Sequence, residues 1–436
     1  MKHHSRRPAN LSRTRSKRCI ASTISGALIF GTLLLGALAP FAQAGDWPQI
    51  LGPQRNGKAP KEEKLAESWP VFGPPVLWTK NVGDGYAGIV TAGDRAILFH
   101  RLGDNEVIEC LQVDNGKTLW TSEYPTTFRA QVGGGTGPLA TPAIADGKVV
   151  TFGAQGVLAC HDLKTGERQW LIKTHEDYGA REGYFGAGSS PLVDEGRVIV
   201  NVGGFRSNAS VVAFSLKTGE ELWKTLNDHA SYSSPVITHW NDKKQIAIIT
   251  RLHCLLLNPK TGAIDAQFDF GQVGPTVNGA VPTVLGNQLF LTASYGIGGL
   301  LLTNDTKTTT ETWRADDLYS SQYCTPIEHQ GVLFGVDGRD DLPPAELKCF
   351  DPITRKTLWT APESRYGHLI FADGKLLMLS TDGQLSLIRA NILKYDPIAT
   401  CSPLTGTTRA IPALSNGRLF IRDDKILKCL NVAPKP

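Results

Sequence analysis

One pattern recurs along the chain and limits its possible folds more than any other feature. Each copy has a proline before a short apolar strand, a tight turn, a second and a third strand, and then Thr-Gly followed by a tryptophan. The clearest copies span 142–170 and 191–223. Further copies start at Pro235, Pro282, Pro326 and Pro412, and degenerate ones start near Val90 and Leu369. The tryptophans recur at intervals of about 40 to 55 residues, a period typical of four-stranded propeller blades.

The turn residues support this period. Asp-Gly or Asn-Gly pairs stand between the first and second apolar strands at 146–147, 373–374 and 416–417. Such pairs favour two-residue hairpin turns, because both central residues need positive φ. Thr-Gly pairs at 165–166, 218–219 and 261–262 suit a type I turn that ends in a left-handed glycine. They are expected to join the third and fourth strands of each blade.

We therefore predict an all-β fold, an eight-bladed propeller of four-stranded antiparallel blades over 76–436. The last copy stops at Leu430 after three strands, and an unattached strand near 76–80 supplies the fourth. Pairing the two would close the ring and remove two exposed sheet edges. The segment 45–75, rich in Pro and Gly, is expected to form a strap along the outside. No helix is expected after residue 44.

Residues 1–44 read as a secretory signal peptide. Seven basic residues and no acidic one precede an apolar run over 20–39, and Ala42-Gln43-Ala44 resembles a cleavage site. The alternative is an uncleaved membrane anchor. The chain is thus expected in the periplasm or cell envelope. Its formal charge of +4 comes from this segment, so no nucleic-acid partner is expected.

Two segments, 159–170 and 213–223, resemble the tryptophan-docking repeats of the pyrroloquinoline-quinone-like, or quinoprotein, propellers. The opening 46–57 also resembles the start of secreted bacterial proteins with this repeat. That family includes quinone-dependent alcohol dehydrogenases and non-catalytic BamB-like propellers. The resemblance implies that a tryptophan of each blade packs on the next blade, which here assigns a structural role to Trp120, Trp170, Trp223, Trp313 and Trp359. The fourth unit has Ala266 at this position, and residues 391–403 have no clear equivalent.

The cysteines are expected to be packing residues. Five of them fall at the same position of the third strand in different units: Cys110, Cys160, Cys254, Cys349 and Cys429. Equivalent positions of separate blades are farther apart than the roughly 7 Å that a disulfide allows between Cα atoms. Cys324 and Cys401 lie outside this register, and their state stays open.

No catalytic residue, metal site or cofactor is predicted. The resemblance implies that catalytic relatives hold their quinone between a vicinal cysteine disulfide and a tryptophan, with carboxylates on Ca²⁺. This chain has no Cys-Cys pair and no Cys-x-x-Cys-His. The glycine-rich stretch 133–137 is interpreted as a blade connection, and 337–341 as a solvated turn rather than a cation loop. A quinoprotein oxidoreductase remains the alternative function.

The connections that precede each leading proline are expected to rim the central channel. They carry polar and aromatic side chains able to hydrogen-bond and stack on a ligand. The predicted ligand-binding residues are Arg129, Arg181, Tyr184, His229, Tyr232, Tyr323, Arg365 and His368. The expected function is an exported, non-catalytic and monomeric module that binds an envelope protein, a peptide or a glycan. Two alternatives stay open, namely that these strand ends are polar because they meet water, or that partners bind the strap.

Overall fold

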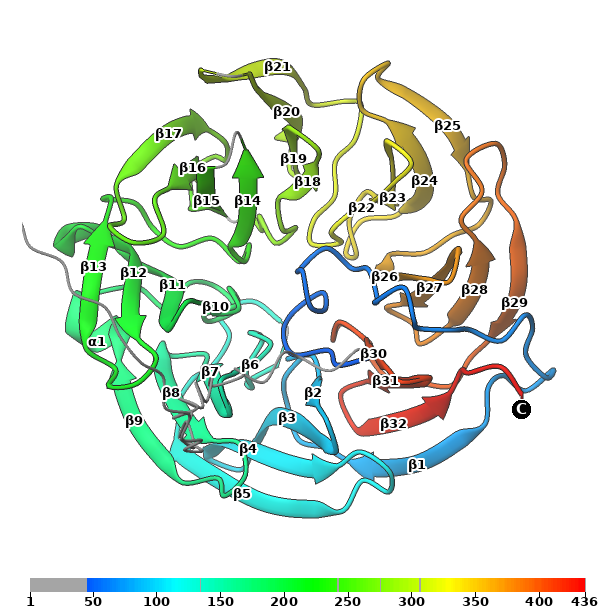
Figure 1. Cartoon of the computed structure of the whole chain (residues 1–436), viewed down its shortest axis with the longest axis horizontal. Coiled ribbons are helices and arrows are strands. Elements are labelled where there is room, and N and C mark those ends of the chain that lie inside the picture. The colour runs from blue at the N-terminus through cyan, green and yellow to red at the C-terminus, as the bar shows by residue number, and fades with distance from the viewer. Residues whose placement is uncertain (1–44, 134, 241–242, 275, 306, 436) are drawn as a thin grey trace, which may run out of the picture. The chain divides into compact units, whose positions relative to one another are not determined.

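The computed structural model describes residues 45–435, except 134, 241–242, 275 and 306; the expected signal peptide lies outside the described residues. The described residues form eight four-stranded antiparallel sheets in a ring (Figure 1). In chain order, blades one to four consist of β2 (Val90–Ala92), β3 (Arg95–Leu102), β4 (Asn105–Gln112), β5 (Thr118–Pro125); β6 (Ala143–Ala145), β7 (Lys148–Phe152), β8 (Val157–Asp162), β9 (Arg168–Lys173); β10 (Leu192–Asp194), β11 (Arg197–Gly204), β12 (Ala209–Ser215), β13 (Glu221–Thr225); β14 (Val236–Trp240), β15 (Lys243–Ile249), β16 (His253–Leu257), β17 (Ile264–Asp269).

Blades five to eight follow the same order from the innermost to the outermost strand. They consist of β18 (Thr283–Leu285), β19 (Gln288–Ala293), β20 (Gly298–Asn304), β21 (Thr309–Ala315); β22 (Ile327–His329), β23 (Val332–Asp337), β24 (Glu346–Asp351), β25 (Lys356–Thr360); β26 (Gly367–Ala372), β27 (Lys375–Ser380), β28 (Leu385–Arg389), β29 (Pro397–Cys401); β30 (Ala413–Ser415), β31 (Arg418–Arg422), β32 (Ile426–Asn431), β1 (Val76–Asn81). The predicted eight-bladed all-β propeller is confirmed.

Two short helices are exceptions to the expectation of strands alone after residue 44. They are α1 (Thr174–Tyr178), in the connection after β9, and a 3₁₀ turn, η1 (Phe205–Ser207), between β11 and β12. Gly179 ends α1 in the left-handed region with φ 62°, a conformation that glycine adopts without strain. Among the described residues, no helix has the length and apolar content needed to cross a membrane.

The hairpin turns follow the predicted chemistry. Asp146 and Gly147 have φ 49° and 70°, and Asn416 and Gly417 have 51° and 72°. Both central residues of each turn thus have the positive φ that a type I′ turn requires. These turns join the first and second strands of their blades, so they set the register in which each short inner strand pairs.

The ring closes where the chain's first described strand meets its last. β1 pairs with β32 in antiparallel register, with Thr79 opposite Lys428. The indole N–H of Trp78 then donates to the carbonyl of Val113 in the first blade at 2.8 Å. Closure therefore joins blades eight and one by backbone hydrogen bonds and by one buried indole.

The same docking contact recurs around the ring and confirms the predicted structural tryptophans. Each indole N–H donates to a carbonyl of the next blade at 2.8 to 3.1 Å: Trp120 to Leu163, Trp170 to Leu216, Trp223 to Pro259, Trp313 to Pro352 and Trp359 to Asn391. In the blades that carry a Thr-Gly pair, its glycine lies under the ring, since a Cβ at Gly166 would come within 2.5 Å of Trp120. Glycine is thus required there both for its positive φ and for the close approach.

Two blades, the fourth and the seventh, lack the tryptophan on the outer strand. Ala266 and Ala399 occupy the equivalent positions, each just after the β-bulge of its outer strand. In the fourth blade Trp240, at the end of β14, donates its indole N–H to Gly286 of the fifth blade at 3.0 Å. The sequence did not predict this replacement, because Trp240 falls on the first strand rather than the fourth.

The cysteine register is largely as predicted. Cys110 faces Trp120 across the strand pair, and Cys160 faces Trp170. Cys254 is an exception, because Leu256 rather than Cys254 lies opposite Ala266. The described cysteines are all free thiols, Cys324 and Cys401 included. Burial raises the pKa of Cys110 to about 12, which keeps this thiol protonated and unreactive.

The strap prediction is wrong for the first half of the segment 45–75. Trp47 and Arg55 are 1% and 2% exposed, and the Arg55 guanidinium donates to the carbonyls of Ser190 at 3.1 Å and Pro191 at 2.9 Å. The segment crosses the middle of the ring (Figure 1). Its Asp46 Oδ1 accepts a hydrogen bond at 2.9 Å from the N–H of Gly93 in the β2–β3 turn, so it lies at the end of the channel opposite the blade connections. The physical reason is burial, since Trp47, Ile50 and Leu51 are removed from water there.

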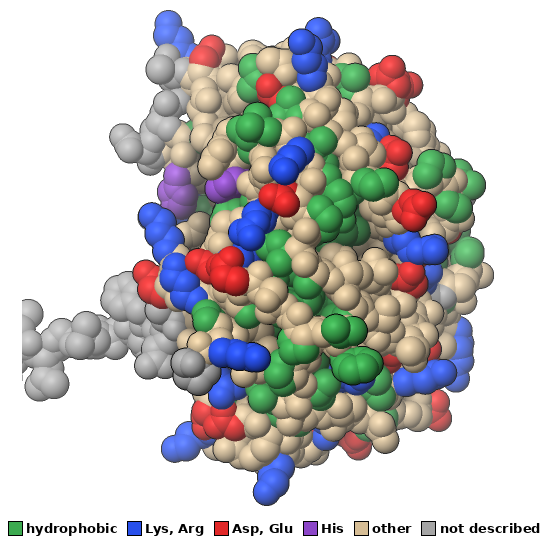
Figure 2. Space-filling model, turned by 90° about the vertical axis from the view of Figure 1, so that its right-hand side faces the viewer, with side chains coloured by type: hydrophobic (Ala, Val, Ile, Leu, Met, Phe, Trp, Pro, Cys, Tyr) green, Lys and Arg blue, Asp and Glu red, His purple; other side chains and the backbone are tan. Residues whose placement is uncertain are grey.

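The side of the ring that Figure 2 shows has mixed charge. Figure 2 looks onto the side of β25, β29 and β1, where hydrophobic, basic and acidic side chains are interspersed. Exposed apolar side chains of the strap end and of β1 include Val71, Phe72, Val76 and Leu77. Mixed charge of this kind does not form the single-sign field that attracts a polyelectrolyte.

We predict that Trp78→Ala destabilises the protein by about 3–5 kcal/mol, because it removes a buried indole and its hydrogen bond at the closure. Leu77→Ala, in the same strand but 44% exposed, is expected to change stability by about 0.5 kcal/mol or less. Urea unfolding followed by tryptophan fluorescence measures both. Equal effects of the two changes would contradict the role assigned to Trp78.

Candidate functional site

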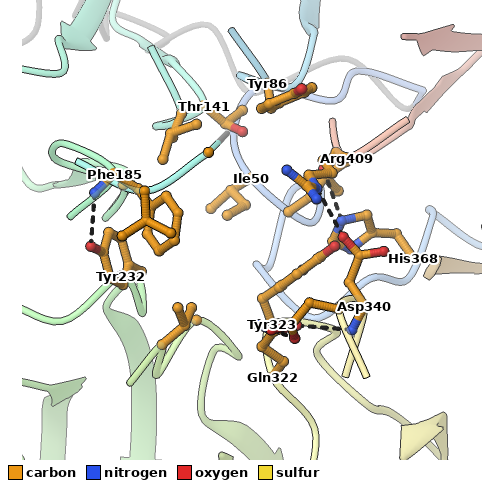
Figure 3. Close-up of a pocket in the computed structure, with 18 of the residues that line it drawn as sticks. Ile50, Tyr86, Thr141, Phe185, Tyr232, Gln322, Tyr323, Asp340, His368 and Arg409 are labelled. Atoms are coloured by element: carbon orange, nitrogen blue, oxygen red, sulfur yellow. Dashed lines mark hydrogen bonds and ion pairs between the residues drawn. The ribbon is translucent and has the colours of Figure 1, made fainter. Parts of the chain in front are cut away.

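A cavity of about 400 Å³ occupies the centre of the ring. Ile50 of the strap lies among its lining residues (Figure 3). At the other end Val132 is 55% exposed and the side chain of Asp341 is 54% exposed. The cavity is therefore a cup, with its floor at the strap and its mouth on the side of the blade connections.

The wall is built by connections between blades, as predicted, together with loops inside two blades, one of which carries Tyr295 between β19 and β20. Phe185 and Tyr232 precede the inner strands β10 and β14, and Arg409 precedes β30. Asp340 and Asp341 come from the loop between β23 and β24. The wall also contains Tyr86, Gly133, Leu139, Thr141, Gly188, Val277, Gly279, Tyr295, Gln322, Tyr323, His368 and Ile411.

One part of the wall is a polar network centred on Asp340. Its Oδ2 bonds the Arg409 Nε at 2.9 Å, and its Oδ1 accepts a hydrogen bond from the Thr381 hydroxyl at 2.8 Å. The Asp340 backbone N–H donates to Gln322 Oε1 at 2.9 Å. Both carboxylate oxygens are thus satisfied, as expected for a carboxylate with a side chain only 13% exposed.

A second ion pair stands beside the first, nearer the mouth. The Nε of Arg339 donates to Asp341 Oδ1 at 2.9 Å, and the guanidinium carbon lies 4.0 Å from the centre of the Tyr295 ring. The Tyr295 hydroxyl accepts a hydrogen bond from Gln322 Nε2 at 2.6 Å. Cation–π and ionic contacts together hold Arg339 against the wall, so its charge balances that of Asp341.

His368 and Tyr323 form the buried end of this polar wall. His368 is 3% exposed, and its Nε2 donates to the carbonyl of Arg409 at 3.0 Å, which places the ring proton on Nε2. Burial lowers the pKa of His368 to about 4. The Tyr323 ring lies 5.4 Å from the His368 ring, and its buried hydroxyl has no hydrogen-bond partner among the described residues.

The opposite wall is aromatic. Figure 3 shows Phe185 and Tyr232 facing the polar residues, with Ile50 between the two sides. The Phe185 and Tyr232 rings contact each other edge to face at 5.9 Å, and the Phe185 backbone N–H donates to the Tyr232 hydroxyl at 3.3 Å. The cup therefore offers an apolar, stackable side and a hydrogen-bonding side to one ligand.

The structure brings three of the eight predicted residues into the cavity wall, namely Tyr232, Tyr323 and His368. The other five lie outside the cavity lining. Arg129, Arg181 and Arg365 are exposed, and Tyr184 and His229 are partly buried. Arg365 pairs with Asp382 at 3.0 Å, and Arg129 lies 3.9 Å from Asp104. His229 stacks on Phe205 with ring centres 5.1 Å apart.

Several wall residues were missed in the sequence. The stretch 337–341 was interpreted as a solvated turn, which is wrong because Asp340 and Asp341 line the cavity. A loop from the second to the third strand lies at the same end of a blade as the connection to its inner strand, so its position along the repeat could have indicated that it reaches the channel. Arg409 and Tyr86 lie in connections before inner strands, where channel residues are expected, but they are not among the predicted residues.

The wall does not fit the quinone cofactor that the resemblance suggests. Neither a tryptophan nor a cysteine is present among the lining residues, so both stacking partners are missing. Asp340 and Asp341 are each engaged by an arginine. No group of three or more potential metal ligands gathers anywhere in the described residues. The lining residues thus leave space for a ligand but lack the stacking partners and the free carboxylates that this cofactor needs.

The chain is similar to known proteins in its sequence and in its fold. The model of the family described as "Outer membrane protein assembly factor BamB" matches residues 76–183 and 103–361. A quinohemoprotein alcohol dehydrogenase, ADH-IIG of Pseudomonas putida, is 29% identical over 130 residues, which span 29% of this chain and only 18% of that protein.

Two solved structures share the fold at low identity. BamB of Moraxella catarrhalis has 14% identity and a TM-score of 0.60, covering 82% of this chain and 99% of that one. Quinohemoprotein alcohol dehydrogenase of Comamonas testosteroni has 14% identity and a TM-score of 0.62, covering 91% and 82%. At such identity the likeness concerns the fold alone.

We predict that acid destabilises the protein partly through His368. Between pH 6.5 and 4 the unfolded chain binds a proton at this residue and the folded chain does not, so unfolding becomes easier as the pH falls. His368→Gln keeps an N–H donor for the Arg409 carbonyl and should reduce the loss of unfolding free energy by about 3 kcal/mol. Urea unfolding at pH 7 and pH 4 tests this, with the exposed His239→Gln as the control. An unchanged pH dependence in His368→Gln would refute it.

Proposed function

The chain belongs to the family described as outer membrane protein assembly factor BamB, and from this premise we propose that it is an exported binding or scaffolding module of the cell envelope. The central cup receives part of a peptide, glycan or small polar ligand. The observation that carries this proposal is the form of the cavity, about 400 Å³ in volume, with Ile50 at its floor and an aromatic and a polar wall. Such a cup can hold a ligand without any reactive group in its wall.

The polar wall supports recognition rather than chemistry. Asp340 and Asp341 each accept hydrogen bonds from an arginine, which holds their charges in fixed positions. A general base needs a carboxylate or imidazole free to accept a proton from the substrate. Held in this way, the groups act as fixed donors and acceptors around a guest.

The exposed rim extends the proposed surface beyond the cup. Arg129, Arg181 and Arg365 stand in connections of three different blades, together with Tyr184 and His229. Exposed arginines at such positions can bind carboxylates or hydroxyls of a large partner. We propose that the cup holds one group of the partner and that the rim contacts the rest.

An oxidoreductase is the second candidate, because one matched relative is a quinohemoprotein alcohol dehydrogenase. That match spans less than a fifth of the relative's length, so its activity is a proposal for this chain and no more. The composition of the cavity wall argues against it. A binding test must therefore include pyrroloquinoline quinone with Ca²⁺ as one of its probes.

We predict that filling the cavity abolishes ligand binding. Val277 lies in the wall and Val273, four residues earlier, is 87% exposed and outside the wall. Thermal unfolding is measured with a panel of short peptides, oligosaccharides, and pyrroloquinoline quinone with Ca²⁺. At least one peptide or oligosaccharide should raise the Tm of the wild type and of Val273→Trp but not of Val277→Trp. Stabilisation by the quinone alone would favour the oxidoreductase, and no stabilisation by any probe would refute a binding cup.

Replacement of Arg129, Arg181 and Arg365 by Ala should weaken capture of envelope partners by roughly 10-fold or more, if each arginine contributes about 0.5–1 kcal/mol. The protein's stability should stay within about 1 kcal/mol, because all three side chains are exposed. Quantitative pull-down from an envelope fraction measures the effect. The control changes Arg168, Arg314 and Arg389 on outer or third strands to Ala. Equal capture by both triple variants would rule out the rim.

A further inference from the structure

Arg409 uses only part of its hydrogen-bonding capacity in the cavity wall. Its Nε bonds Asp340 at 2.9 Å, and its guanidinium carbon lies 5.6 Å from the centre of the Tyr86 ring. No hydrogen bond to the described residues uses its two terminal nitrogens, and 35% of the side chain is exposed. Figure 3 shows the guanidinium pointing toward the middle of the cavity. A fixed guanidinium with a free edge matches an anion that has two oxygens.

The surrounding charges leave this edge available. Asp340 is satisfied by the Nε of Arg409 and by the Thr381 hydroxyl, so it does not need the terminal nitrogens. Asp341 is engaged by Arg339. Each wall carboxylate thus has its own cation, and a guest carboxylate could take the remaining donors of Arg409 without displacing either pair.

The opposite wall selects the rest of the guest. Phe185 and Tyr232 lie across the cavity from Arg409, with Ile50 between the two sides (Figure 3), and Val277 also lines the cavity. Burial of an apolar group there is favourable by roughly 25 cal/mol per Å² of surface removed from water. The cup therefore suits a carboxylate joined to an aromatic or large apolar group.

The cup has one mouth, and this limits what can enter. The strap crosses the other end of the channel, where Trp47 and Leu51 are buried. A chain segment cannot thread through such a cup, whereas a chain end can enter it. We propose that the cavity binds the C-terminal residue of a peptide, with the terminal carboxylate on Arg409 and an aromatic or large apolar side chain against Phe185 and Tyr232. This inference rests on the proposed binding function and names its ligand class.

Calorimetry with matched probes tests the proposal. The peptide acetyl-Gly-Ser-Gly-Ala-Phe with a free carboxylate is compared with its C-terminal amide and with 3-phenylpropionate. We expect the free acid to bind at least about 10-fold more tightly than the amide, because a charge-assisted pair is lost in the amide. Equal affinities of acid and amide, or no binding of either, would overturn the proposal. Binding of 3-phenylpropionate as tight as that of the peptide would assign the cup to small acids and overturn the peptide assignment.

A conservative change tests the role of Arg409. Arg409→Lys keeps a cation beside Asp340 but loses the two-nitrogen edge, so the preference for acid over amide should fall to about 3-fold or less. Arg314→Lys, on the outer strand β21, should leave it unchanged. An undiminished preference in a folded Arg409→Lys would refute the assignment. Should that variant fail to fold, Val277→Trp must abolish binding of the free acid, and its failure to do so would refute the site.

The binding function of the cup and its preference for a C-terminal carboxylate can be refuted independently. Suppose that oligosaccharides or the amide stabilise the protein and that Val277→Trp blocks this effect, while acid and amide bind alike. The central cup would then remain a binding site, and only the carboxylate preference would be wrong.

Discussion

The rest of the structure depends on the docking of a tryptophan of one blade onto a turn of the next. The indole N–H bonds a carbonyl of the neighbouring blade, as in Trp120 to Leu163 at 3.0 Å, and the ring covers Gly166 closely enough to exclude a Cβ. A single four-stranded blade cannot bury both of its faces, so its stability comes from its neighbours. The six repeat tryptophans and Trp240 fix the spacing between blades, and this spacing sets the width of the central channel.

The cavity follows from that ring and from one added segment. Blade connections bring Tyr232 and Arg409 to the channel, and the inner strand β26 brings His368, from distant parts of the sequence. The strap then crosses the far end, anchored by the buried Arg55 guanidinium on the carbonyls of Ser190 and Pro191. Burial lowers the pKa of Arg55 to about 9, and the bonds to carbonyls offset part of its desolvation cost. A channel open at both ends thereby becomes a cup.

Much of the fold could be predicted from the sequence, because turn chemistry and tryptophan spacing are local signals. Asn416-Gly417 and the Thr-Gly pairs specify their turns with only neighbouring residues involved. The site was less predictable, since it depends on where side chains converge in three dimensions. The connections before the inner strands predicted Tyr232, Tyr323 and His368 but not Asp340, because Asp340 lies in a loop inside a blade. Nor does the sequence reveal that the Pro- and Gly-rich strap enters the channel, because burial there depends on the width of the finished ring.

The pairing of β1 with β32 joins Val76 to Leu430, near the two ends of the propeller. The earliest strand to be synthesised must therefore wait for the last one before it gains its partner, and such long-range pairing slows folding. Until then both edges of the incomplete ring expose unpaired backbone groups, which are prone to aggregation. The strap and the closing strand are contiguous in the chain, so the same late event that seals the ring also secures the segment beneath the cup. Shortening the C-terminus would therefore loosen the strap beneath the cup as well as the closing blade.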